Sequence, residues 1–355
     1  MNKYSYQPTA AGKVLEMALS GKYIASVLAA CPSAGKSTII IYALNEFFKK
    51  HPNKRVVIST HNQNILKAQM LETFSEPHVK PEFTFGEFGS GAMVEVGIPS
   101  NASKITSMDM LVVDEAHQYF WENMMDKIMK KYQPEYTILL TGSPSYFVKY
   151  NKAAGTRHKN FGIHFISAEE LMGKEIFSGL DINIVNSDMT SLESTIEDTF
   201  NYAKKENCNL KKIMWACKNI NQAKAIKYYL VKKYNLNVYI STSRNDSNNL
   251  EIKKFKSASE GVLLVVNKGI LGFSDGTITC LIDYKMSKDL EVRYQLIARV
   301  LRKHPKNIRK NYISISCNSK YKKEYVTLSQ TISLFDRDVF MNYTGKAPFN
   351  SLKAV

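Results

Sequence analysis

Three short segments of the sequence combine residue types that bind phosphate or move protons. The first spans residues 30–37 and reads ACPSAGKS, between an apolar run and a helix-like stretch. In such a loop the backbone N–H groups and the helix start face phosphates, the lysine reaches the β and γ oxygens, and a serine holds Mg²⁺. We expect six residues to bind a nucleotide's phosphates, with the serine at 37 also holding the metal: Ser33, Ala34, Gly35, Lys36, Ser37 and Thr38. A plain glycine turn before a helix is the alternative, because Ala30 stands where such a loop usually begins with glycine.

The second segment places two acids directly after an apolar run. Residues 110–117 read MLVVDEAH. A strand that ends in two acids presents them at the carboxyl edge of a sheet, where ligands bind in α/β folds. Asp114 would hold Mg²⁺ through water, and Glu115 would polarise the attacking water. The alternative is a solvated strand end without a chemical role.

The third segment, residues 295–302, reads QLIARVLR. Arg299 and Arg302 are three apart and are expected to share one helix face, with Gln295 one turn before Arg299. If this helix faces the phosphate loop, the two guanidinium groups could meet a γ-phosphate as an arginine finger supplied by the same chain. The alternative is a basic amphipathic helix with its apolar face in the core.

Short β-branched runs alternate with amphipathic stretches along the whole chain, and this predicts an α/β fold with mostly parallel sheets covered by helices. We expect strands at 23–30, 55–60, 110–115, 136–142, 180–185, 211–217, 236–242, 261–267, 279–285 and 311–316. We expect helices at 37–51, 63–74, 221–234 and 290–304. The predicted domains are residues 1–174 and 175–319, followed by a helical tail at 320–355.

Composition excludes several protein classes. Of the 355 residues, 44% are apolar and 23% charged, which is typical of a soluble globular protein. No apolar run is long enough to span a membrane, and the start of the chain lacks the apolar stretch of a signal peptide. The five cysteines are scattered and never form CxxC, which argues against disulfide frameworks and zinc knuckles. We expect a cytoplasmic protein that binds no membrane.

The net charge of +16 is unevenly distributed. Residues 1–200 hold 19 basic and 21 acidic side chains, whereas residues 201–330 hold 26 basic and 9 acidic ones. A strongly cationic half beside a nearly neutral one indicates a polyanionic partner such as nucleic acid. A merely solvated basic surface, or a docking surface for an acidic protein, is the alternative.

Together the three segments resemble motifs of the superfamily 2 helicases and translocases. AGKS is similar to their motif I, DEAH at 114–117 to motif II, and QLIARVLR to motif VI, in which Ala298 replaces a glycine. The resemblance implies two tandem RecA-like domains, each a mostly parallel sheet flanked by helices, with an ATP cleft between them. PSAGKS and QLIARVLRKH look most like phage UvsW-type and XPB-like DNA helicases, and the Lys-, Asn- and Ile-rich composition would suit a phage enzyme.

The resemblance also assigns roles outside the three segments. It implies nucleotide contacts by Gln7, at the adenine, and by Gly272 and Asp275. It implies coupling of hydrolysis to domain motion by His117, Thr141 and Ser143. It implies nucleic-acid contacts by eight residues: Thr60, His61, Gln69, Thr106, Lys218, Asn267, Lys268 and Gly269. Two positions depart from the pattern, because Asn267 stands where threonine is usual and Thr106 lies unusually close to Asp114.

These observations predict a nucleic-acid-stimulated ATPase that uses ATP and Mg²⁺. We expect a monomeric DNA helicase or translocase that unwinds, migrates or anneals strands without reading sequence, with a replication or recombination protein supplying specificity. An RNA helicase and an ATP-switched clamp or annealing factor are the alternatives. Trp215 and Tyr294 lie in apolar patterns and are expected in the core. For Arg293 two interpretations remain, a phosphate contact or a place in a solvated helix end.

Overall fold

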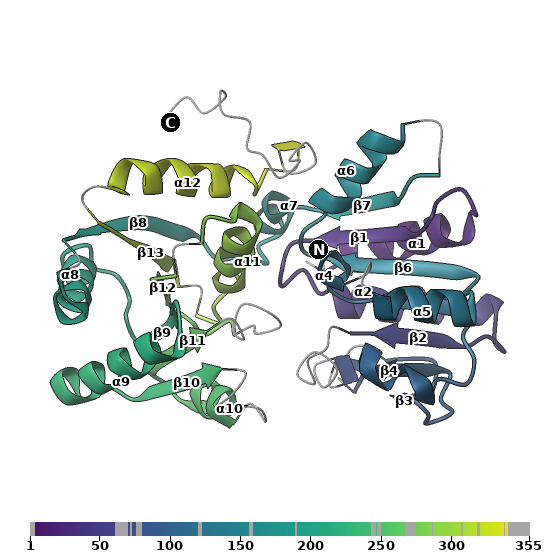
Figure 1. The fold of residues 1–355 in the computed structure, drawn as a ribbon, viewed down its shortest axis with the longest axis horizontal. Helices are drawn as coiled ribbons and strands as arrows, with labels where there is room; N and C mark the ends of the chain where they lie inside the picture. The colour runs from purple at the N-terminus through teal and green to yellow at the C-terminus, as the bar shows by residue number, and fades with distance from the viewer. Residues whose placement is uncertain are drawn as a thin grey trace. The chain divides into compact units, whose positions relative to one another are not determined.

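The structure is a computed structural model of the chain. It describes residues 4–60, 70–71, 73–75, 80–119, 123–155, 159–188, 190–242, 246, 250–266, 275–285, 287–306, 308–317, 320–336 and 338–339. The chain divides into two compact units between Ser167 and Ala168. Each unit contains one parallel sheet with helices packed against it (Figure 1).

The first unit is built on a seven-stranded sheet with strand order β3-β4-β2-β5-β6-β1-β7. All of its strand pairs are parallel. The strands are β1 (Ser26–Ala30), β2 (Val56–Ser59), β3 (Phe85–Glu87), β4 (Val94–Gly97), β5 (Met110–Val113), β6 (Tyr136–Thr141) and β7 (Gly162–Ile166). The carboxyl ends of β1, β5 and β6 therefore meet at one edge of the sheet.

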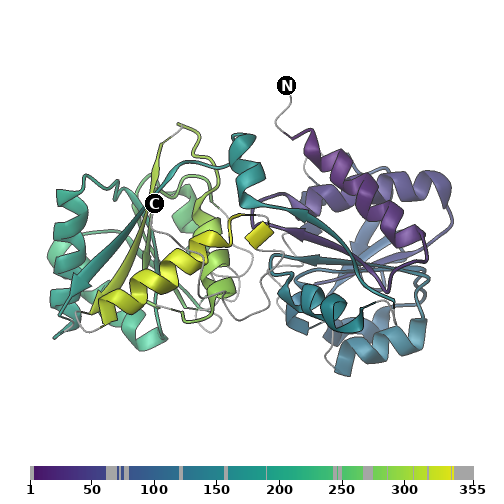
Figure 2. The ribbon, with the colours of Figure 1, turned by 90° about the horizontal axis from the view of Figure 1, so that it is seen from above.

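Helices cover both faces of this sheet, as Figure 2 shows. They are α1 (Tyr6–Leu19), α2 (Lys36–Lys50), α4 (Ala116–Tyr119), α5 (Asn123–Tyr132), α6 (Ser145–Ala154) and the 3₁₀ helix η1 (Pro99–Lys104). In α2 the apolar residues Ile40, Leu44, Phe47 and Phe48 recur at helical spacing and are buried. α1 packs against α2 and also contacts β1, β6 and β7.

The second unit contains a six-stranded parallel sheet with strand order β10-β11-β9-β12-β13-β8. Its strands are β8 (Leu180–Ser187), β9 (Lys212–Ala216), β10 (Val238–Thr242), β11 (Gly261–Val266), β12 (Cys280–Asp283) and β13 (Lys310–Cys317). Its helices are α7 (Ala168–Gly173), α8 (Leu192–Lys205), α9 (Ile220–Tyr234), α10 (Leu250–Ser257), α11 (Leu290–Val300) and α12 (Tyr321–Ser333). The C-terminal helix α12 packs on α11, β13 and β8 within this unit.

Alternation along β13 separates the two faces of the second sheet. Ile313 and Ile315 point into a core to which α8 and α9 also contribute. Tyr312 and Ser314 point the opposite way and bond to Arg293 of α11. α8 and α9 therefore cover one face and α11 and α12 the other, as the two-residue period of a strand requires.

All ten predicted strands are present, with ends close to those expected. Strands β3, β4 and β7 lie outside the predicted runs. β3 and β7 are the two edge strands of their sheet, where half-buried residues weaken the apolar signal of a strand. The predicted helix at 63–74 lies mostly outside the described residues.

The predicted helix at 290–304 is wrong at its C-terminal end, because α11 stops at Val300. Beyond it, the backbone pairs with the segment that leads into β8. The N–H of Ser178 donates to the carbonyl of Leu301 at 2.7 Å, and Arg302 forms an antiparallel bridge with the same segment. These backbone groups bond to a distant strand-like segment instead of continuing the helical ladder.

Within the described residues, no helix is both long and apolar enough to cross a membrane. All five cysteines are free thiols, and burial raises the pKa of Cys217 to about 12.

A buried ion network joins α11 to α12 and to the sheet. Arg293 is fully buried; its Nε donates to the Tyr312 hydroxyl at 3.0 Å, and its Nη2 donates to Ser314 Oγ at 2.8 Å and to the Glu324 carboxylate. Arg293 Nε also lies 3.4 Å from Asp283 Oδ2. A buried guanidinium needs such partners, because an uncompensated charge in the interior is costly.

Both sequence alternatives for Arg293 are therefore wrong, since a side chain with 0% exposure is neither solvated nor open to a phosphate. The expectation that Trp215 and Tyr294 belong to the core is confirmed, because both are fully buried.

Replacing Arg293 by methionine should lower the free energy of unfolding by about 3–5 kcal/mol, because two buried carboxylates lose their cation. The matched control is Arg309→Met, which removes an exposed ion pair with Asp181 and should cost at most about 1 kcal/mol. Urea denaturation of both variants measures the difference. Equal losses would show that the buried network contributes no more than a surface pair.

Candidate functional site

The loop between β1 and α2 has the geometry of an anion-binding nest. β1 ends at Ala30 and α2 begins at Lys36. Ser33 and Gly35 both have left-handed backbone conformations, with φ of 70° and 79°. Such turns point successive N–H groups to one side, and the first N–H groups of a helix have no carbonyl of that helix to bond to. The loop can therefore receive phosphate oxygens.

Helix α1 supports this loop from behind. The Tyr6 hydroxyl donates to the carbonyl of Ala34 at 2.6 Å. A Cβ atom added to Gly35 would lie 2.4 Å from Gln7 Nε2, the end of a flexible side chain, so glycine is favoured here chiefly by the left-handed backbone conformation. Gln7 is 7% exposed, and its amide lies against the loop. Its predicted adenine contact stays a prediction.

The two acids of the second segment follow β5 at the same sheet edge. The N–H of Asp114 donates to Ser59 O at 2.9 Å, and Asp114 Oδ1 accepts from the N–H of Glu115 at 3.0 Å. Glu115 is 5% exposed and has a φ of 51°. Its carboxylate lies 3.9 Å from Lys36 Nζ. The structure thus brings the lysine of the first segment and the glutamate of the second together.

A chain of polar contacts continues from Glu115 across the sheet edge. Glu115 Oε2 lies 3.6 Å from His117 Nδ1, which lies 3.0 Å from Thr141 Oγ1. The Thr141 hydroxyl donates to Ser143 O at 3.0 Å and accepts from the N–H of Ser143 at 2.9 Å. When the hydroxyl proton is directed to Ser143 O, Thr141 Oγ1 accepts from His117 Nδ1 in the tautomer that carries the proton on Nδ1. The three residues assigned to coupling are therefore linked, although their effect on motion stays a prediction.

The residues of this edge fit a nucleotide with a magnesium ion. Among the described residues no group of three or more His, Cys, Asp or Glu side chains could hold a metal by itself. A Mg²⁺ ion bound with a nucleotide does not need such a group, because it takes only one or two ligands from the protein and the rest from substrate phosphates and water. Ser37 in the first turn of α2 and Asp114 after β5 supply that pair of ligand types. Thr38 follows on the same helix.

Two residues predicted to bind nucleic acid in the first unit do not lie together. Thr60 follows β2 at the carboxyl edge, but it is fully buried and its hydroxyl donates to Gly97 O at 3.3 Å. Thr106 is exposed and precedes β5, so it lies at the amino edge. They therefore do not form one contact surface, and a phosphate contact by Thr60 would require its hydroxyl to leave Gly97. His61 and Gln69 lie outside the described residues.

In the second unit, the residues of the third segment lie at the end of α11. Gln295 and Arg299 are one helical turn apart and are 4% and 7% exposed. Arg302 is exposed and lies beyond the helix. The prediction that the two arginines share a helix face is therefore wrong, because the helix ends between them. A meeting of Arg299 and Arg302 with a γ-phosphate stays a prediction.

Asp275 belongs to a cluster of buried charges at the amino edge of the second sheet. Lys212 and Lys310 begin strands β9 and β13. Lys212 Nζ lies 3.3 Å from Asp275 Oδ2, and Lys310 Nζ donates to Gly276 O at 2.9 Å. A Cβ atom on Gly276 would lie 3.8 Å from Arg302 Cγ. Two residues predicted from separate segments, Asp275 and Arg302, therefore share one edge. Gly272 lies outside the described residues.

This cluster contains a lysine with a strongly altered pKa. Burial lowers the pKa of Lys310 from 10.5 to about 7; the carboxylate of Asp275 opposes this effect and Arg302 adds to it. Burial also lowers the pKa of His304, with further contributions from Lys310 and Lys306. Lys310 therefore changes its charge near neutral pH.

Lys218 lies at the opposite, carboxyl edge of the second sheet, directly after β9. It is exposed, and its Nζ is 5.0 Å from the centroid of the Tyr284 ring, after β12. Its position suits the predicted phosphate contact, which stays a prediction. The other residues assigned to nucleic acid in this unit, Asn267, Lys268 and Gly269, lie outside the described residues.

Sequence reasoning missed the buried charges of the second unit. A signal was present for Arg293, which is three residues after Leu290 and three before Leu296 and so lies on the apolar stripe of its helix. Lys212 and Lys310 likewise stand at the start of apolar strand runs. A charged side chain on an apolar stripe indicates a buried partner, which only the folded chain identifies.

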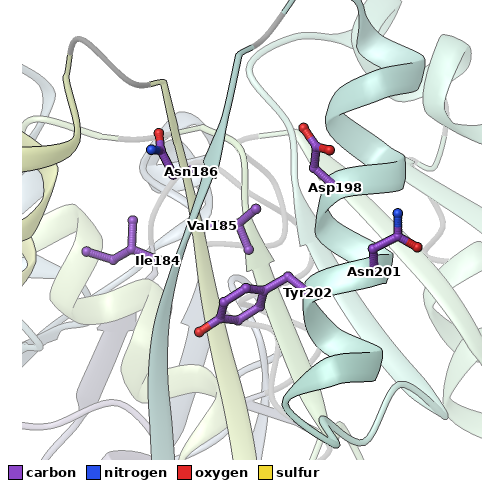
Figure 3. Close-up of a pocket in the computed structure, with 6 residues that line it drawn as sticks. All are labelled: Ile184, Val185, Asn186, Asp198, Asn201 and Tyr202. Carbon is purple, nitrogen blue, oxygen red and sulfur yellow. The ribbon is translucent and has the colours of Figure 1, made fainter.

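A pocket of about 420 Å³ lies between β8 and α8, away from all predicted site residues. Figure 3 shows Asp198, Asn201 and Tyr202 on α8 and the remaining lining residues on β8. The lining residues are Ile184, Val185, Asn186, Asp198, Asn201 and Tyr202. Asp198 accepts a hydrogen bond from Ser187, at 2.6 Å, so its carboxylate already has a structural partner.

Comparison with known proteins agrees with this architecture. Residues 1–146, less than half of the chain, match the family described as "Type III restriction enzyme, res subunit" (ResIII). No curated protein matches the chain. A structure of Mss116p bound to ssRNA and AMP-PNP is similar with a TM-score of 0.63 and 14% identity, over 95% of this chain and 75% of that one. A Dbp5 variant of S. cerevisiae bound to RNA and ADP BeF3 is similar with a TM-score of 0.61 and 14% identity, over 94% of this chain and 91% of that one.

These matches extend over nearly the whole chain and confirm the predicted fold of two tandem RecA-like domains. At 14% identity they establish the fold and leave the reaction to be argued from the residues.

Replacing Gly35 by alanine should destabilise the protein by about 1–2 kcal/mol, because the left-handed backbone is unfavourable for alanine, whereas the end of the Gln7 side chain can shift away from the new Cβ. The matched control is Gly12→Ala in α1, where a Cβ meets nothing within 4 Å and should stabilise the helix by about 0.5–1 kcal/mol. Thermal denaturation measures both. Adding Gln7→Ala to Gly35→Ala should not recover the stability lost through the backbone. Changes of equal sign in the two glycine variants would contradict the geometry.

Between pH 7 and 10.5 the unfolded chain binds more protons at Lys310 than the folded chain, because burial lowers the folded pKa. The free energy of unfolding of the wild type should therefore rise with pH in this range relative to Lys310→Met, by on the order of 1 kcal/mol per pH unit. Urea denaturation at pH 7 and pH 9 measures the change. The control is Lys306→Met, at an exposed position, whose free energy of unfolding should change with pH as that of the wild type does. The same pH dependence in Lys310→Met and the wild type would refute the prediction.

Proposed function

We propose that this chain is an ATP-dependent helicase or translocase of superfamily 2, acting on nucleic acid and with DNA as its substrate. One observation supports this most directly: Lys36 of the phosphate loop lies 3.9 Å from Glu115, which continues through His117 to Thr141. A phosphate-binding lysine beside a buried carboxylate is the arrangement required for hydrolysis of a nucleoside triphosphate. The match of residues 1–146 to ResIII agrees with it.

In this proposal the first unit performs the hydrolysis. The N–H groups of the loop and Lys36 bind the β- and γ-phosphates, while Gln7 lies beside the base. Ser37 and Asp114 hold Mg²⁺, which when bound neutralises charge on the phosphate oxygens. Glu115 orients and polarises the attacking water. Lys36 then exchanges its contact with Glu115 for the phosphates, which leaves that carboxylate free to accept a hydrogen bond from water.

The second unit completes the site when the two units close. Arg299 and Arg302 would stabilise charge on the γ-phosphate, and Asp275 would contact the nucleotide at the same edge. Loss of the γ-phosphate would remove the arginine contacts and allow the units to separate. The contacts among His117, Thr141 and Ser143 would transmit this change within the first unit.

The nucleic acid would bind through its backbone. Residues 201–330 carry 26 basic and 9 acidic side chains, and Lys218 at the carboxyl edge of the second sheet offers an exposed cation. Such binding depends on salt and does not read sequence. DNA is favoured by the likeness of the motifs to UvsW-type and XPB-like helicases. RNA is the second candidate, because both similar solved structures are bound to RNA.

Steady-state ATP hydrolysis tests the proposal. The wild type should be stimulated by nucleic acid, whereas Lys36→Ala should lose at least about 100-fold in stimulated turnover, because the transferred phosphate loses its cation. Glu115→Gln should still bind ATP yet lose turnover to a similar extent. The matched control is Lys13→Ala at an exposed position of α1, which should retain wild-type turnover.

The proposal fails if Lys36→Ala keeps its stimulated hydrolysis. Single-stranded, forked and four-way DNA, each beside its RNA counterpart, separate the candidates: stimulation by RNA alone would replace the DNA assignment. Binding of ATP without measurable turnover in the wild type would favour the clamp or annealing factor instead.

A further inference from the structure

The outward face of α9 carries cations that the proposed ATPase cycle does not use. The helix reads INQAKAIKYYLVKKY, with four lysines and no acid. Its apolar residues Ala223, Ile226 and Leu230 are fully buried in the core of the second unit. This packing sets the rotation of the helix, so residues on the opposite side must face outward.

The outward side carries a basic stripe with an aromatic centre, which we define as the exposed Lys224, Tyr228 and Lys232 together with Lys227, which is half-buried at the edge of the buried face. Tyr228 is 67% exposed, the largest exposed fraction among the large hydrophobic side chains of the described residues. Lys232 Nζ lies 5.6 Å from the centroid of the Tyr228 ring. Single exposed aromatic side chains are common on protein surfaces, and what distinguishes Tyr228 is the ammonium group that lies over its ring.

One lysine of α9 forms an ion pair with another helix. Lys233 forms an ion pair with Glu197 of α8 and also contacts Tyr229. Among the described residues, the three lysines of the basic stripe form no ion pair with a carboxylate. Their charges are therefore not used to hold the helix in place, in contrast to that of Lys233.

Hydrogen bonds connect the start of α9 to the carboxyl edge of the sheet. The side chain of Asn219 caps α9 by accepting from the N–H of Gln222, and Gln222 Oε1 accepts from the N–H of Lys218 at 2.7 Å. Lys218 is therefore hydrogen-bonded to the first turn of α9. From Lys224 to Lys232 the helix rises about 12 Å, so the basic stripe is long enough to reach more than one phosphate of a strand.

We propose that the basic stripe of α9 is a second contact surface for single-stranded nucleic acid, beyond the edge that carries Lys218. The inference rests on the proposed function, which brings a strand to that edge. Lys224, Lys227 and Lys232 contact successive phosphates, and Tyr228 stacks on an unpaired base. The combination of cations that follow the backbone with an aromatic ring is how proteins bind single strands without reading sequence.

Binding to a fluorescent single-stranded oligodeoxythymidine and to a blunt duplex of equal length, measured by anisotropy across salt concentrations, tests the proposal. Lys224→Gln, Lys227→Gln and Lys232→Gln together should reduce the slope of log K against log salt by about 2 on the single strand. Tyr228→Ala should weaken single-strand binding by about tenfold and change duplex binding by less than about twofold.

The matched control replaces Lys204, Lys205 and Lys323 by Gln. These three lysines are exposed on α8 and α12 of the same unit, so the control removes the same number of positive charges. It should leave the slope close to that of the wild type. An equal slope change in both triple variants would overturn the proposal, as would equal effects of Tyr228→Ala on single strand and duplex. ATP hydrolysis by the wild type in the presence of the single strand is measured separately. Stimulated hydrolysis with unchanged binding by the stripe variants would overturn the stripe alone, whereas absence of hydrolysis would overturn the proposed function.

Discussion

Parallel pairing of every strand in both sheets is the constraint on which the candidate site depends. It brings the ends of β1, β5 and β6 to one edge, with β6 between the other two. Lys36, Glu115 and Thr141 are far apart in sequence, yet a continuous series of contacts joins them there. Reversing the direction of any of these strands would place the residues that follow it at the opposite edge. The chemistry at this edge is therefore a consequence of strand direction.

The backbone of the first unit is held in costly conformations at the same place. Ser33 and Glu115 are non-glycine residues with left-handed φ values of 70° and 51°, each of which costs on the order of 1–2 kcal/mol. Packing elsewhere must offset this cost. The buried hydroxyl of Tyr6, bonded to the carbonyl of Ala34, is one contact that holds the loop in this form. Such local strain commonly marks residues whose orientation matters for a ligand.

In the second unit, buried charges hold the candidate site residues in position, whereas in the first unit the backbone conformation of the loops does so. Arg293 ties α11 to β12, β13 and α12 through Asp283, Tyr312 and Glu324. This fixes the rotation of α11 and so the position of Arg299 in its last turn. Burying ions rarely adds stability over an apolar core, but it disfavours alternative packings that would leave a charge without a partner. The network therefore explains why α12 belongs to the second unit.

The sequence by itself determined ten of the thirteen strands that the structure describes, the loop before α2 and the paired acids, because apolar runs, Gly35 with Lys36, and acids after a strand are local patterns. Only the tertiary structure decided that α11 ends at Val300, since that end depends on a backbone bond to Ser178, more than a hundred residues away. The burial of Thr60 and the partners of Arg293 were likewise decided by contacts between distant segments. Local patterns reveal which residues must be buried or bonded, whereas the partner that satisfies them is chosen by the packing of the whole unit.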